Sequence, residues 1–398
     1  MKFAHLADCH LGAWREPKLR DLNLKAFSKA IDLCINEKVD FVVIAGDLFN
    51  NSYPSHDSLM SAVIKLRELR EKSIPVYVIA GSHDFSATGK TMIDVLEEAG
   101  LLVNVAAVSM NEGNPVFKLT LDTKTGVFLC GIPGLKGMLD KKYYESIKQY
   151  ENKPGYKIFL FHTTLTELKP SELKEAESLP LSLLPKGFSY YAGGHVHYVF
   201  EKTEPGYGTI AFPGPTFPNN MKEVEDLGRG GLFIVDNGIA KWHPIQVLNT
   251  FVIDVDCDHK SPQQVESAIV ELSKNKEFNE TLVALRLHGT LGSGSPADID
   301  FKKVYGFLYD KSAYFVMKNT AKLASKEFVQ INVEHKSVEE MEAKLIREHL
   351  DQVKGPSNEL EATKDLMHAL GREKPEGEKV SDFESRIVKE SMHALDLG

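Results

Sequence analysis

The sequence FVVIAGDLFN, residues 41–50, decides the fold, because an apolar run rich in β-branched residues ends abruptly in Gly46 and Asp47. The same arrangement occurs upstream in KFAHLADCH, residues 2–10, and downstream in PVYVIAGSHD, residues 75–84. Each apolar run has the length of a buried strand, and apolar residues between the first two runs recur near a 3.6-residue period. Short buried strands that alternate with helices predict a layered α/β fold.

Six strands and two helices are expected in the first half of the chain. The helices are the crossover around Leu22–Cys34 and the segment Ser55–Arg70. After residue 250 a strand, a helix, another strand and a later helix indicate a separate small α/β module. The six expected strands are Lys2–Ala7, Val39–Ala45, Pro75–Ala80, Val127–Ile132, Lys157–Phe161 and Ser189–Ala192.

Composition narrows the class of protein. The 398 residues suffice for two or three domains, and 42% hydrophobic with 26% charged residues is typical of a globular protein. No stretch approaches the roughly 18 apolar residues of a membrane span. The four cysteines lie far apart without a CxxC pair, so reduced thiols in a cytoplasmic protein are expected. The net charge of −9 does not exclude nucleic acid as a substrate, because metal ions can reverse the local field of a site.

Aspartate and histidine residues follow the ends of five predicted strands. Ligands of an open α/β sheet gather outside the carboxyl ends of its strands, so these side chains are expected to share one crevice. Any one of them alone would be an ordinary turn or surface residue, whereas the whole set indicates a functional site. His5, inside the first strand, is expected to pack in the core instead. In chain order the set is Asp8, His10, Asp47, His83, Asp84, His162, His195 and His197.

These residue types point to metal-dependent hydrolysis. Mixed carboxylate and imidazole ligands without cysteine suit Mn²⁺, Fe²⁺ or Zn²⁺. Carboxylates that bridge two such ions, roughly 3.5–4 Å apart, are typical of hydrolytic metal pairs. Such a pair lowers the pKa of water and neutralises phosphoryl oxygens, while a nearby imidazole can assist the leaving alkoxide.

The order of the motifs D-x-H, G-D, G-N-H-D, H and G-H-x-H resembles that of the calcineurin-like metallophosphoesterases, with GSHD as the third motif here. Five segments are similar to those of the DNA double-strand-break-repair nucleases of archaea and eukaryotes, the counterparts of bacterial SbcD. They are HLADCHLG, FVVIAGDLF, PVYVIAGSHD, FHTTLTE and YYAGGHVHY. The similarity covers residues 1–245, and for residues 250–330 only order and size agree.

The resemblance implies a layered metallophosphoesterase β-sandwich flanked by helices over residues 1–248, a small α/β capping domain over 249–333 and a helical partner-binding segment over 334–398. It implies a manganese-dependent DNA exonuclease and endonuclease with two Mn²⁺ ions, in the cytoplasm of a prokaryote at the nucleoid. The implied partners are DNA, a second copy of the chain through the helix Ser55–Arg70 and the helix that precedes it, and a coiled-coil ABC-type ATPase of the SbcC kind. The segments that would bind the ATPase are the predicted tail helices Ser337–Val353, Asn358–Leu370 and Ser381–Leu395.

The resemblance also implies a role for each site residue. His83 would be the catalytic imidazole near the leaving group. The family has asparagine at the position of Ser82 and histidine at that of Asn50, and the shorter serine side chain predicts a weaker second metal site. One ion would be held by Asp8, His10, Asp47 and His197, and the other by Asp47, Ser82, His162 and His195. Phosphate or DNA contacts are predicted for Asn50, Arg15, Lys90 and Arg229.

Two other functions are compatible with the same residues. A phosphatase or small-molecule phosphodiesterase of the same superfamily would use the same ligands, but it would not need the long chain after residue 250. A catalytically weak structural subunit would explain the departures at Ser82 and Asn50. Cleavage of linear duplex DNA, measured beside cleavage of a chromogenic phosphoester, distinguishes the three.

Overall fold

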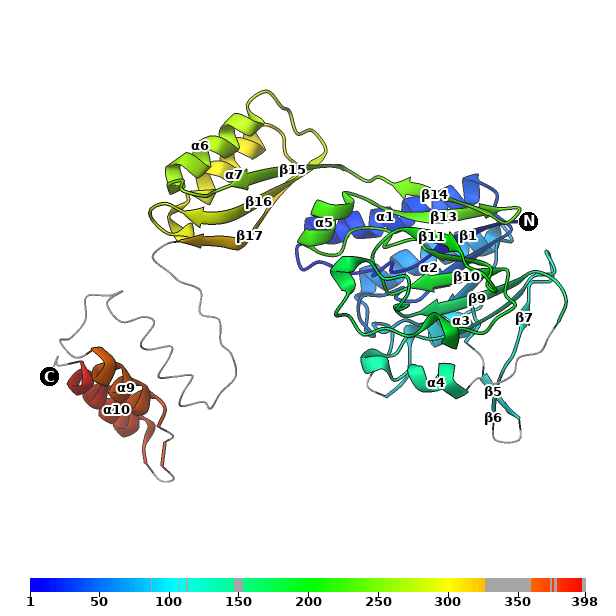
Figure 1. Ribbon diagram of the computed structural model, residues 1–398, viewed down its shortest axis with the longest axis horizontal. Coiled ribbons are helices and arrows are strands. Elements are labelled where there is room, and N and C mark those ends of the chain that lie inside the picture. The colour runs from blue at the N-terminus through cyan, green and yellow to red at the C-terminus, as the bar shows by residue number, and fades with distance from the viewer. Residues whose placement is uncertain are drawn as a thin grey trace. The chain divides into compact units, whose positions relative to one another are not determined.

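The computed structural model describes residues 1–325, apart from 87, 107, 112–113 and 147–152, and residues 359–395, apart from 373 and 376–377. The chain forms two compact units (Figure 1). The first consists of Met1–Asp254, Leu272–Arg286 and Tyr305–Asn319, and the second of the other described segments. The predicted tail helix Ser337–Val353 lies outside the described residues.

Two six-stranded sheets dominate the first unit. Strands β1 to β4 are parallel neighbours in one sheet, and β8, β9, β10 and β12 are parallel in the other. The first sheet has the order β14 (Ile239–Ile245), β13 (Gly230–Asp236), β1 (Lys2–Leu6), β2 (Phe41–Ala45), β3 (Val76–Ile79), β4 (Val103–Asn104). The second has the order β11 (Phe200–Thr203), β12 (Thr209–Phe212), β10 (Tyr190–Gly194), β9 (Lys157–His162), β8 (Phe128–Ile132), β7 (Thr120–Leu121).

The two sheets pack face to face through aromatic residues. Phe3 of β1 stacks on Phe41 of β2 with ring centroids 5.1 Å apart, and it meets Tyr190 of β10 edge-on at 5.2 Å. All three side chains are fully buried. Burying a large apolar side chain of this kind stabilises the fold by about 1.5–3 kcal/mol. The layered sandwich predicted from the sequence is thus confirmed.

Helices cover the outer face of the first sheet. They are α1 (Pro17–Asn36), α2 (His56–Glu71) and α3 (Met92–Glu98). Phe27 and Ile31 of α1 belong to one buried cluster with Ile44 of β2. Because β2 is buried on both faces, its sequence is a continuous apolar run rather than an alternating one. On the outer face of the second sheet, Tyr144 of α4 (Lys141–Ser146) joins a further core cluster.

The remaining elements include the strand-helix-strand-helix order predicted after residue 250, followed by a third strand that was not predicted. The three strands after residue 248 form one sheet in the order β15, β16, β17. The domain boundaries at 248 and 333 stay predictions. The elements are β5 (Val108–Asn111), β6 (Asn114–Phe117), α5 (Met221–Leu227), β15 (Asn249–Asp256), α6 (Pro262–Ser273), β16 (Thr281–Leu291), α7 (Phe301–Asp310), β17 (Phe315–Ser325), α9 (Glu359–Leu370) and α10 (Val380–Ala394). Short 3-10 helices cover Lys136–Met138, Ser171–Leu173, Leu181–Leu183 and Pro296–Asp298.

All six strands predicted in the first half are present, with ends within two residues of the prediction. The predicted helix Ser55–Arg70 is α2, displaced by one residue at each end. Among the described residues, no helix combines the length and the apolar character that a membrane span requires.

Candidate metal centre

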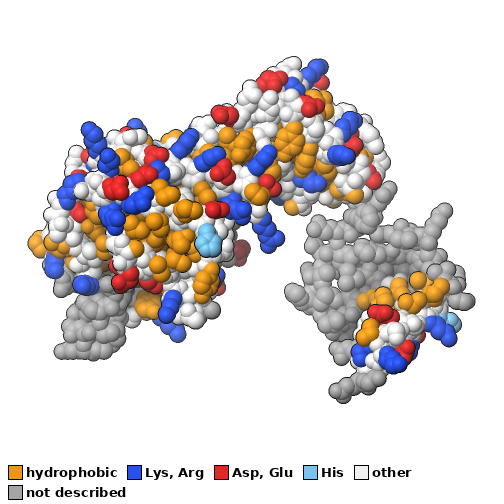
Figure 2. All heavy atoms as spheres, turned by 180° about the vertical axis from the view of Figure 1, so that it is seen from behind, with side chains coloured by type: hydrophobic (Ala, Val, Ile, Leu, Met, Phe, Trp, Pro, Cys, Tyr) orange, Lys and Arg blue, Asp and Glu red, His pale blue; other side chains and the backbone are white. Residues whose placement is uncertain are grey.

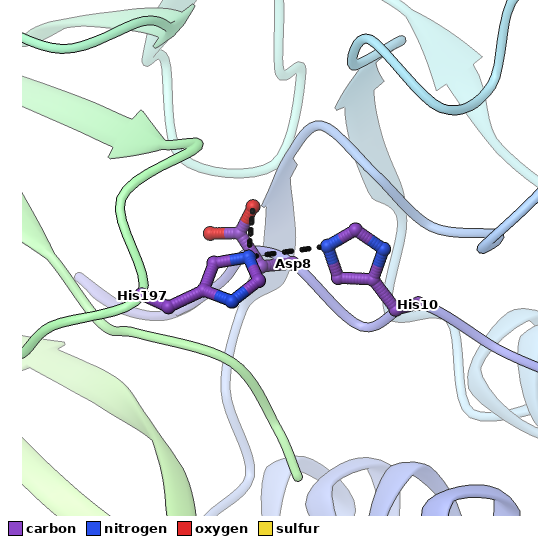
Figure 3. Close-up of side chains that lie close together, drawn as sticks. All are labelled: Asp8, His10 and His197. Carbon is purple, nitrogen blue, oxygen red and sulfur yellow. Dashed lines mark hydrogen bonds and ion pairs between the residues drawn. The ribbon is translucent and has the colours of Figure 1, made fainter. Parts of the chain in front are cut away.

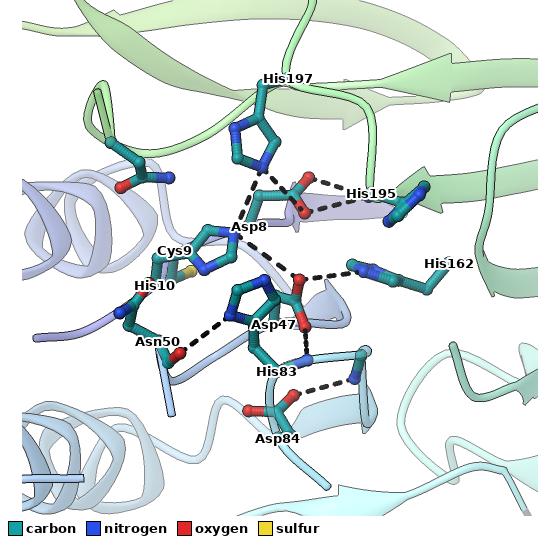
Figure 4. A network of polar contacts seen from close by, with 12 residues as sticks. Asp8, Cys9, His10, Asp47, Asn50, His83, Asp84, His162, His195 and His197 are labelled. Atoms are coloured by element: carbon teal, nitrogen blue, oxygen red, sulfur yellow. Dashed lines mark hydrogen bonds and ion pairs between the residues drawn. The ribbon is translucent and has the colours of Figure 1, made fainter. Parts of the chain in front are cut away.

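The functional side chains lie at or just beyond the carboxyl ends of parallel strands from both sheets (Figure 4). Asp8 follows β1 and Asp47 follows β2 in the first sheet. His162 is the last residue of β9, and His197 follows β10, in the second sheet. Side chains almost 190 positions apart in the sequence therefore meet at one place, as expected of a site at the carboxyl ends of an α/β sheet.

Several of these residues have a left-handed backbone conformation. Asp8, His10 and Asp47 have φ values of 50°, 43° and 50°, and His195 has a φ of 85°. Residues other than glycine seldom adopt this conformation, and those that do cluster at functional sites. The sharp turns at the strand ends bring the carboxylates and imidazoles toward a common centre.

Two glycines allow the loops to close around that centre. Gly46 has a φ of +87°, and a Cβ atom there would lie 2.2 Å from Nδ1 of His162. A Cβ atom on Gly81 would lie 2.3 Å from the backbone nitrogen of Asp47. Both positions exclude any side chain, which explains the glycines that precede Asp47 and Ser82 in the sequence motifs.

Asp8, His10 and His197 form one group of potential ligands (Figure 3). Nε2 of His197 lies 3.7 Å from Oδ1 of Asp8 and 3.2 Å from Nε2 of His10. Two imidazole nitrogens that face each other beside a buried carboxylate offer three donor atoms to one point. Such a set of nitrogen and oxygen donors suits a divalent transition metal.

Asp47 links this group to a second one. Its Oδ2 lies 3.6 Å from Nε2 of His10 and 3.1 Å from Nε2 of His162. Nδ1 of His162 donates to the carbonyl of Ala45 at 2.8 Å, which directs the other ring nitrogen toward Asp47. The ring of His195 stands beside that of His162, with centroids 5.2 Å apart. Asp47 is therefore placed between the two groups.

Burial and charge set the protonation of these residues. Burial raises the pKa of the Asp8 carboxyl to about 6 and lowers the pKa of His10 to about 3. Burial also opposes ionisation of Asp47, but the charges of His162 and His10 hold its pKa well below the usual range. Burial disfavours the imidazolium of His162, yet the neighbouring Asp47 carboxylate raises its pKa to about 10. In the metal-free chain a proton on His162 therefore faces the carboxylate of Asp47.

A divalent ion fits this donor set. Nε2 of His162 is buried and lies 3.1 Å from Oδ2 of Asp47, as an ion pair outside the geometry of a hydrogen bond. Buried carboxylates need a compensating positive charge, which the His162 proton supplies in the metal-free chain. A metal ion would supply the same charge and satisfy the imidazole nitrogens as well. The residues in position to hold metal are Asp8, His10, Asp47, His83, His162 and His197.

His83 lies at the edge of the ligand groups. Its backbone N–H donates to Oδ1 of Asp47 at 2.8 Å, and its ring meets that of His10 edge-on with centroids 4.8 Å apart. A ring nitrogen of His83 is close enough to His10 and Asp47 for the three to hold an ion. Its role as a catalytic imidazole rather than a ligand therefore stays a prediction.

Asn50 contacts His83 through the main chain. Nδ1 of His83 donates to the backbone carbonyl of Asn50 at 2.9 Å. The side chain at position 50 takes no part in this hydrogen bond. The asparagine that replaces the family's histidine thus leaves the orientation of His83 intact.

A cavity of about 370 Å³ adjoins the second ligand group. Ser82, His162 and His195 all contribute to its wall, so Ser82 lies near these two histidines, and its role as a ligand stays a prediction. Asp140 is a further wall residue, and its burial raises the pKa of its carboxyl to about 6. The other lining residues are His83, Leu135, Lys136, Gly137, Thr163, Thr164, Ala176 and Glu177.

The predicted DNA-contacting cations do not line this cavity. Nη1 of Arg229 donates to Oε1 of Gln246 at 3.2 Å. Arg15 and Lys90 are exposed. Their contact with DNA stays a prediction.

Two carboxylates near the site contact other site residues. Asp84 belongs to the strand-end set predicted from the sequence, whereas Glu223 was not predicted. Asp84 accepts hydrogen bonds from the backbone of Gly81 at 2.9 Å and of Phe49 at 3.0 Å, which ties together the loops after β3 and β2. Glu223 accepts a hydrogen bond from Nδ1 of His197 at 2.8 Å. In the sequence, Glu223 stands three residues after Asn220, a spacing that indicates a helix cap rather than a functional site.

Comparisons with known proteins agree with this geometry. The model of the calcineurin-like phosphoesterase family matches residues 1–199. A protein named DNA double-strand break repair protein Mre11 from Archaeoglobus fulgidus is 27% identical over 381 residues, covering 87% of this chain and 80% of its own length. Proteins of the same name are 27% identical in Methanocaldococcus jannaschii, covering 86% and 88%, and 26% identical in Sulfolobus acidocaldarius, covering 73% and 76%. The resemblance stated from the sequence motifs is thus confirmed.

Proposed function

The chain belongs to the calcineurin-like phosphoesterase family, and from this premise we propose that it is a two-metal DNA nuclease that hydrolyses phosphodiesters at DNA ends in double-strand-break repair. The observation that carries the proposal is the convergence of two buried carboxylates and three imidazoles, those of Asp8, Asp47, His10, His162 and His197. Relatives named for DNA double-strand break repair match most of the chain, including the part after residue 250. That extent favours DNA over a small phosphoester as the substrate.

The proposed cofactors are two Mn²⁺ ions with Asp47 between them. Divalent ions in such a pair lower the pKa of water and neutralise the oxygens of a phosphoryl group during in-line displacement. Ser82 would serve the ion on the cavity side, and its short neutral hydroxyl reaches less far than an asparagine carbonyl. One ion is assigned to Asp8, His10, Asp47 and His197, and the other to Asp47, Ser82, His162 and His195.

The main chain prepares His83 for a role near the leaving group. A carbonyl oxygen can only accept, so the hydrogen bond to Asn50 fixes a proton on Nδ1 of His83. Nε2 is the ring atom left to face a departing alkoxide, and it would donate to that oxygen when it carries the second proton. His83 would neutralise the charge that develops on that oxygen.

Cleavage assays on three substrates test the function. Linear duplex DNA, covalently closed circular DNA and a chromogenic phosphodiester are each incubated with the full chain, with and without Mn²⁺. We expect Mn²⁺-dependent degradation of linear duplex DNA, abolished in Asp47→Asn and retained in Asp226→Asn, a charge-matched change at an exposed position of α5. Activity on the chromogenic ester alone would favour a phosphatase or small-molecule phosphodiesterase, and activity on none would favour a structural subunit.

We also propose that α2 forms a homodimer interface. Met60 and Ile64 of α2 are 55% and 39% exposed, and Tyr53 just before the helix is 77% exposed. Leu66 is buried in the core, so the outward apolar side of α2 is distinct from its core-facing side. Hydrophobic side chains gather over a broad area of the first unit on the face opposite that of Figure 1 (Figure 2). A symmetric pair of such faces would bury these side chains.

Light scattering at micromolar concentration tests the dimer. The wild-type chain should have the mass of two copies, and Met60→Glu with Ile64→Glu should have the mass of one. The matched control is Ile239→Glu, which changes an exposed isoleucine in β14. A wild-type mass of one chain would contradict the proposed interface.

Helices α9 and α10 are proposed to bind a coiled-coil ABC-type ATPase of the SbcC kind. Two of the three predicted tail helices are present, within one residue of the predicted ends. Two ion pairs link α10 to the segment between α9 and α10: Arg386 with Glu378 at 2.9 Å, and Glu390 with Arg372 at 3.2 Å. Exposed ion pairs of this kind contribute little stability. We place this complex in the cytoplasm of a prokaryote, at the nucleoid. A helix partner would bury the apolar side chains that remain exposed. These are Met367, Leu370, Val380, Val388 and Met392.

A further inference from the structure

A carboxylate outside the ligand groups contacts one of the imidazoles within them. Oε1 of Glu223 accepts a hydrogen bond from Nδ1 of His197 at 2.8 Å. The opposite ring nitrogen of His197, Nε2, faces Asp8 and His10. The hydrogen bond therefore determines which nitrogen of the ring carries the proton and which is free to bind metal.

We propose that Glu223 is a positioning residue for the metal site, which holds the imidazole of His197 with its Nε2 lone pair toward the ion shared with Asp8 and His10. The inference rests on the proposed metal-dependent function. A histidine ligand without such a partner can rotate or adopt the other tautomer, and loss of an outer carboxylate typically weakens metal binding by about 10–100-fold. Glu223 does not touch the ion itself in this arrangement.

The carboxylate is itself held in place at the start of α5. Its Oε2 accepts from the backbone N–H of Asn219 at 2.8 Å. Its backbone N–H donates to the Asn220 side chain at 2.9 Å, so Asn220 caps the helix that carries Glu223. Gly228, with a left-handed φ of 67°, ends the helix. Both carboxylate oxygens are therefore committed, one to His197 and one to the main chain.

The opposite side of α5 is tied to strands β16 and β17. Glu225 has a side chain only 1% exposed, and it forms an ion pair with Arg286 of β16 at 3.2 Å. It also accepts a hydrogen bond from Asn319 of β17 at 3.3 Å. The Glu225 carboxylate is buried, so removal of Arg286 would leave its charge without a compensating partner. The position of Glu223, and through it that of His197, thus depends on contacts with residues far beyond the phosphoesterase motifs.

Calorimetric titration of the metal-free full chain with Mn²⁺ tests the proposal. Glu223→Leu keeps the approximate size of the side chain and removes the acceptor, so we expect one site to bind about 10–100-fold more weakly. Glu223→Gln keeps an acceptor but loses the charge, so a smaller loss of about 3–10-fold is expected at the same site. The other site should keep its affinity within about threefold in both variants.

The matched control is Asp226→Ala, which removes a negative charge from an exposed position of the same helix. Its Mn²⁺ affinities should equal those of the wild type, and an equal loss in this variant would overturn the positioning role. Circular dichroism of the metal-free variants verifies folding. Where Glu223→Leu does not fold, Glu223→Gln decides, and wild-type affinity at both of its sites would overturn the proposal. Absence of Mn²⁺ binding by the wild type would instead refute the proposed metal-dependent function.

Discussion

Replacing His5 by glutamine should remove part of the acid sensitivity of the fold. His5 lies inside β1 and is fully buried. Its ring is parallel to that of Phe233 at 6.5 Å and edge-on to that of Tyr190 at 5.7 Å, and Nδ1 lies 3.0 Å from the Tyr190 hydroxyl. Burial lowers the pKa of this imidazole to about 3, against about 6.5 in an unfolded chain. The folded protein therefore holds His5 neutral where the unfolded chain takes up a proton.

The lowered pKa makes the folded chain less stable as the pH falls below 6.5. The contribution of neutral His5 is fully present above pH 6.5 and is lost progressively between pH 6.5 and about 3, because only the unfolded state binds the proton there. At pH 5 the loss is about 2 kcal/mol, and near pH 3 it approaches 5 kcal/mol, by linkage at about 1.4 kcal/mol per pH unit. At 2–4 °C per kcal/mol for a unit of this size, the melting temperature falls by about 4–8 °C between pH 8 and pH 5 on account of His5 alone.

Thermal unfolding of the wild type and of His5→Gln, followed from pH 8 to pH 5 in the presence of EDTA, measures this difference. Glutamine keeps a polar group near the Tyr190 hydroxyl but does not titrate. The variant is expected to be less stable at pH 8, and the gap in melting temperature should close by about 4–8 °C at pH 5. His56→Gln, at the exposed start of α2, controls for the loss of one histidine. A difference in melting temperature between wild type and His5→Gln that stays constant from pH 8 to pH 5 would refute the reasoning.

Four further variants test the site and the tail. His83→Ala should still bind two Mn²⁺ ions in calorimetry but hydrolyse DNA about 10²–10⁴-fold more slowly. Asp47→Ala should abolish Mn²⁺ binding. An equal loss of metal in the two variants would show that His83 is a ligand. Ser82→Asn should lower one of two Mn²⁺ dissociation constants, and unchanged or lost binding would mean that the loop is arranged around serine. Deleting residues 335–398 should leave Mn²⁺-dependent cleavage near normal and abolish co-purification with a coiled-coil ATPase, and undiminished co-purification would disprove the tail assignment.

The sheets could be predicted from the sequence because burial on both faces leaves a local signal. Phe41–Ala45 is apolar at every position, and the Gly46–Asp47 pair that follows it marks the strand end. The hairpin of β5 and β6 and the third strand of the later sheet carry no comparable run. β5 and β6 are four residues each and pair with each other, and β17 mixes polar and apolar residues, so none of the three has a clear local pattern.

The same contrast holds at the site. Asp8, Asp47 and His162 follow or end apolar strands, and this position alone indicated their shared location. Asp84 also follows a strand and so belonged to the predicted set, whereas Glu223 acts through a hydrogen bond to His197, and such a partner leaves no spacing rule in the sequence. The contact of His83 with Asn50 is likewise invisible, because it uses a backbone carbonyl that any residue at position 50 would provide.

The candidate metal centre would draw its ligands from both layers of the sandwich. Asp8, His10 and Asp47 follow strands of one sheet, while His162 and His197 belong to strand ends of the other. Divalent ions would bind this set of residues only in the folded state, because the unfolded chain does not bring the ligands of the two sheets together. A ligand present at 100 times its dissociation constant stabilises the state it binds by about 2.7 kcal/mol. That is comparable to burying one large apolar side chain between the sheets, so metal binding and sheet packing reinforce each other at the edge where the five strand ends meet.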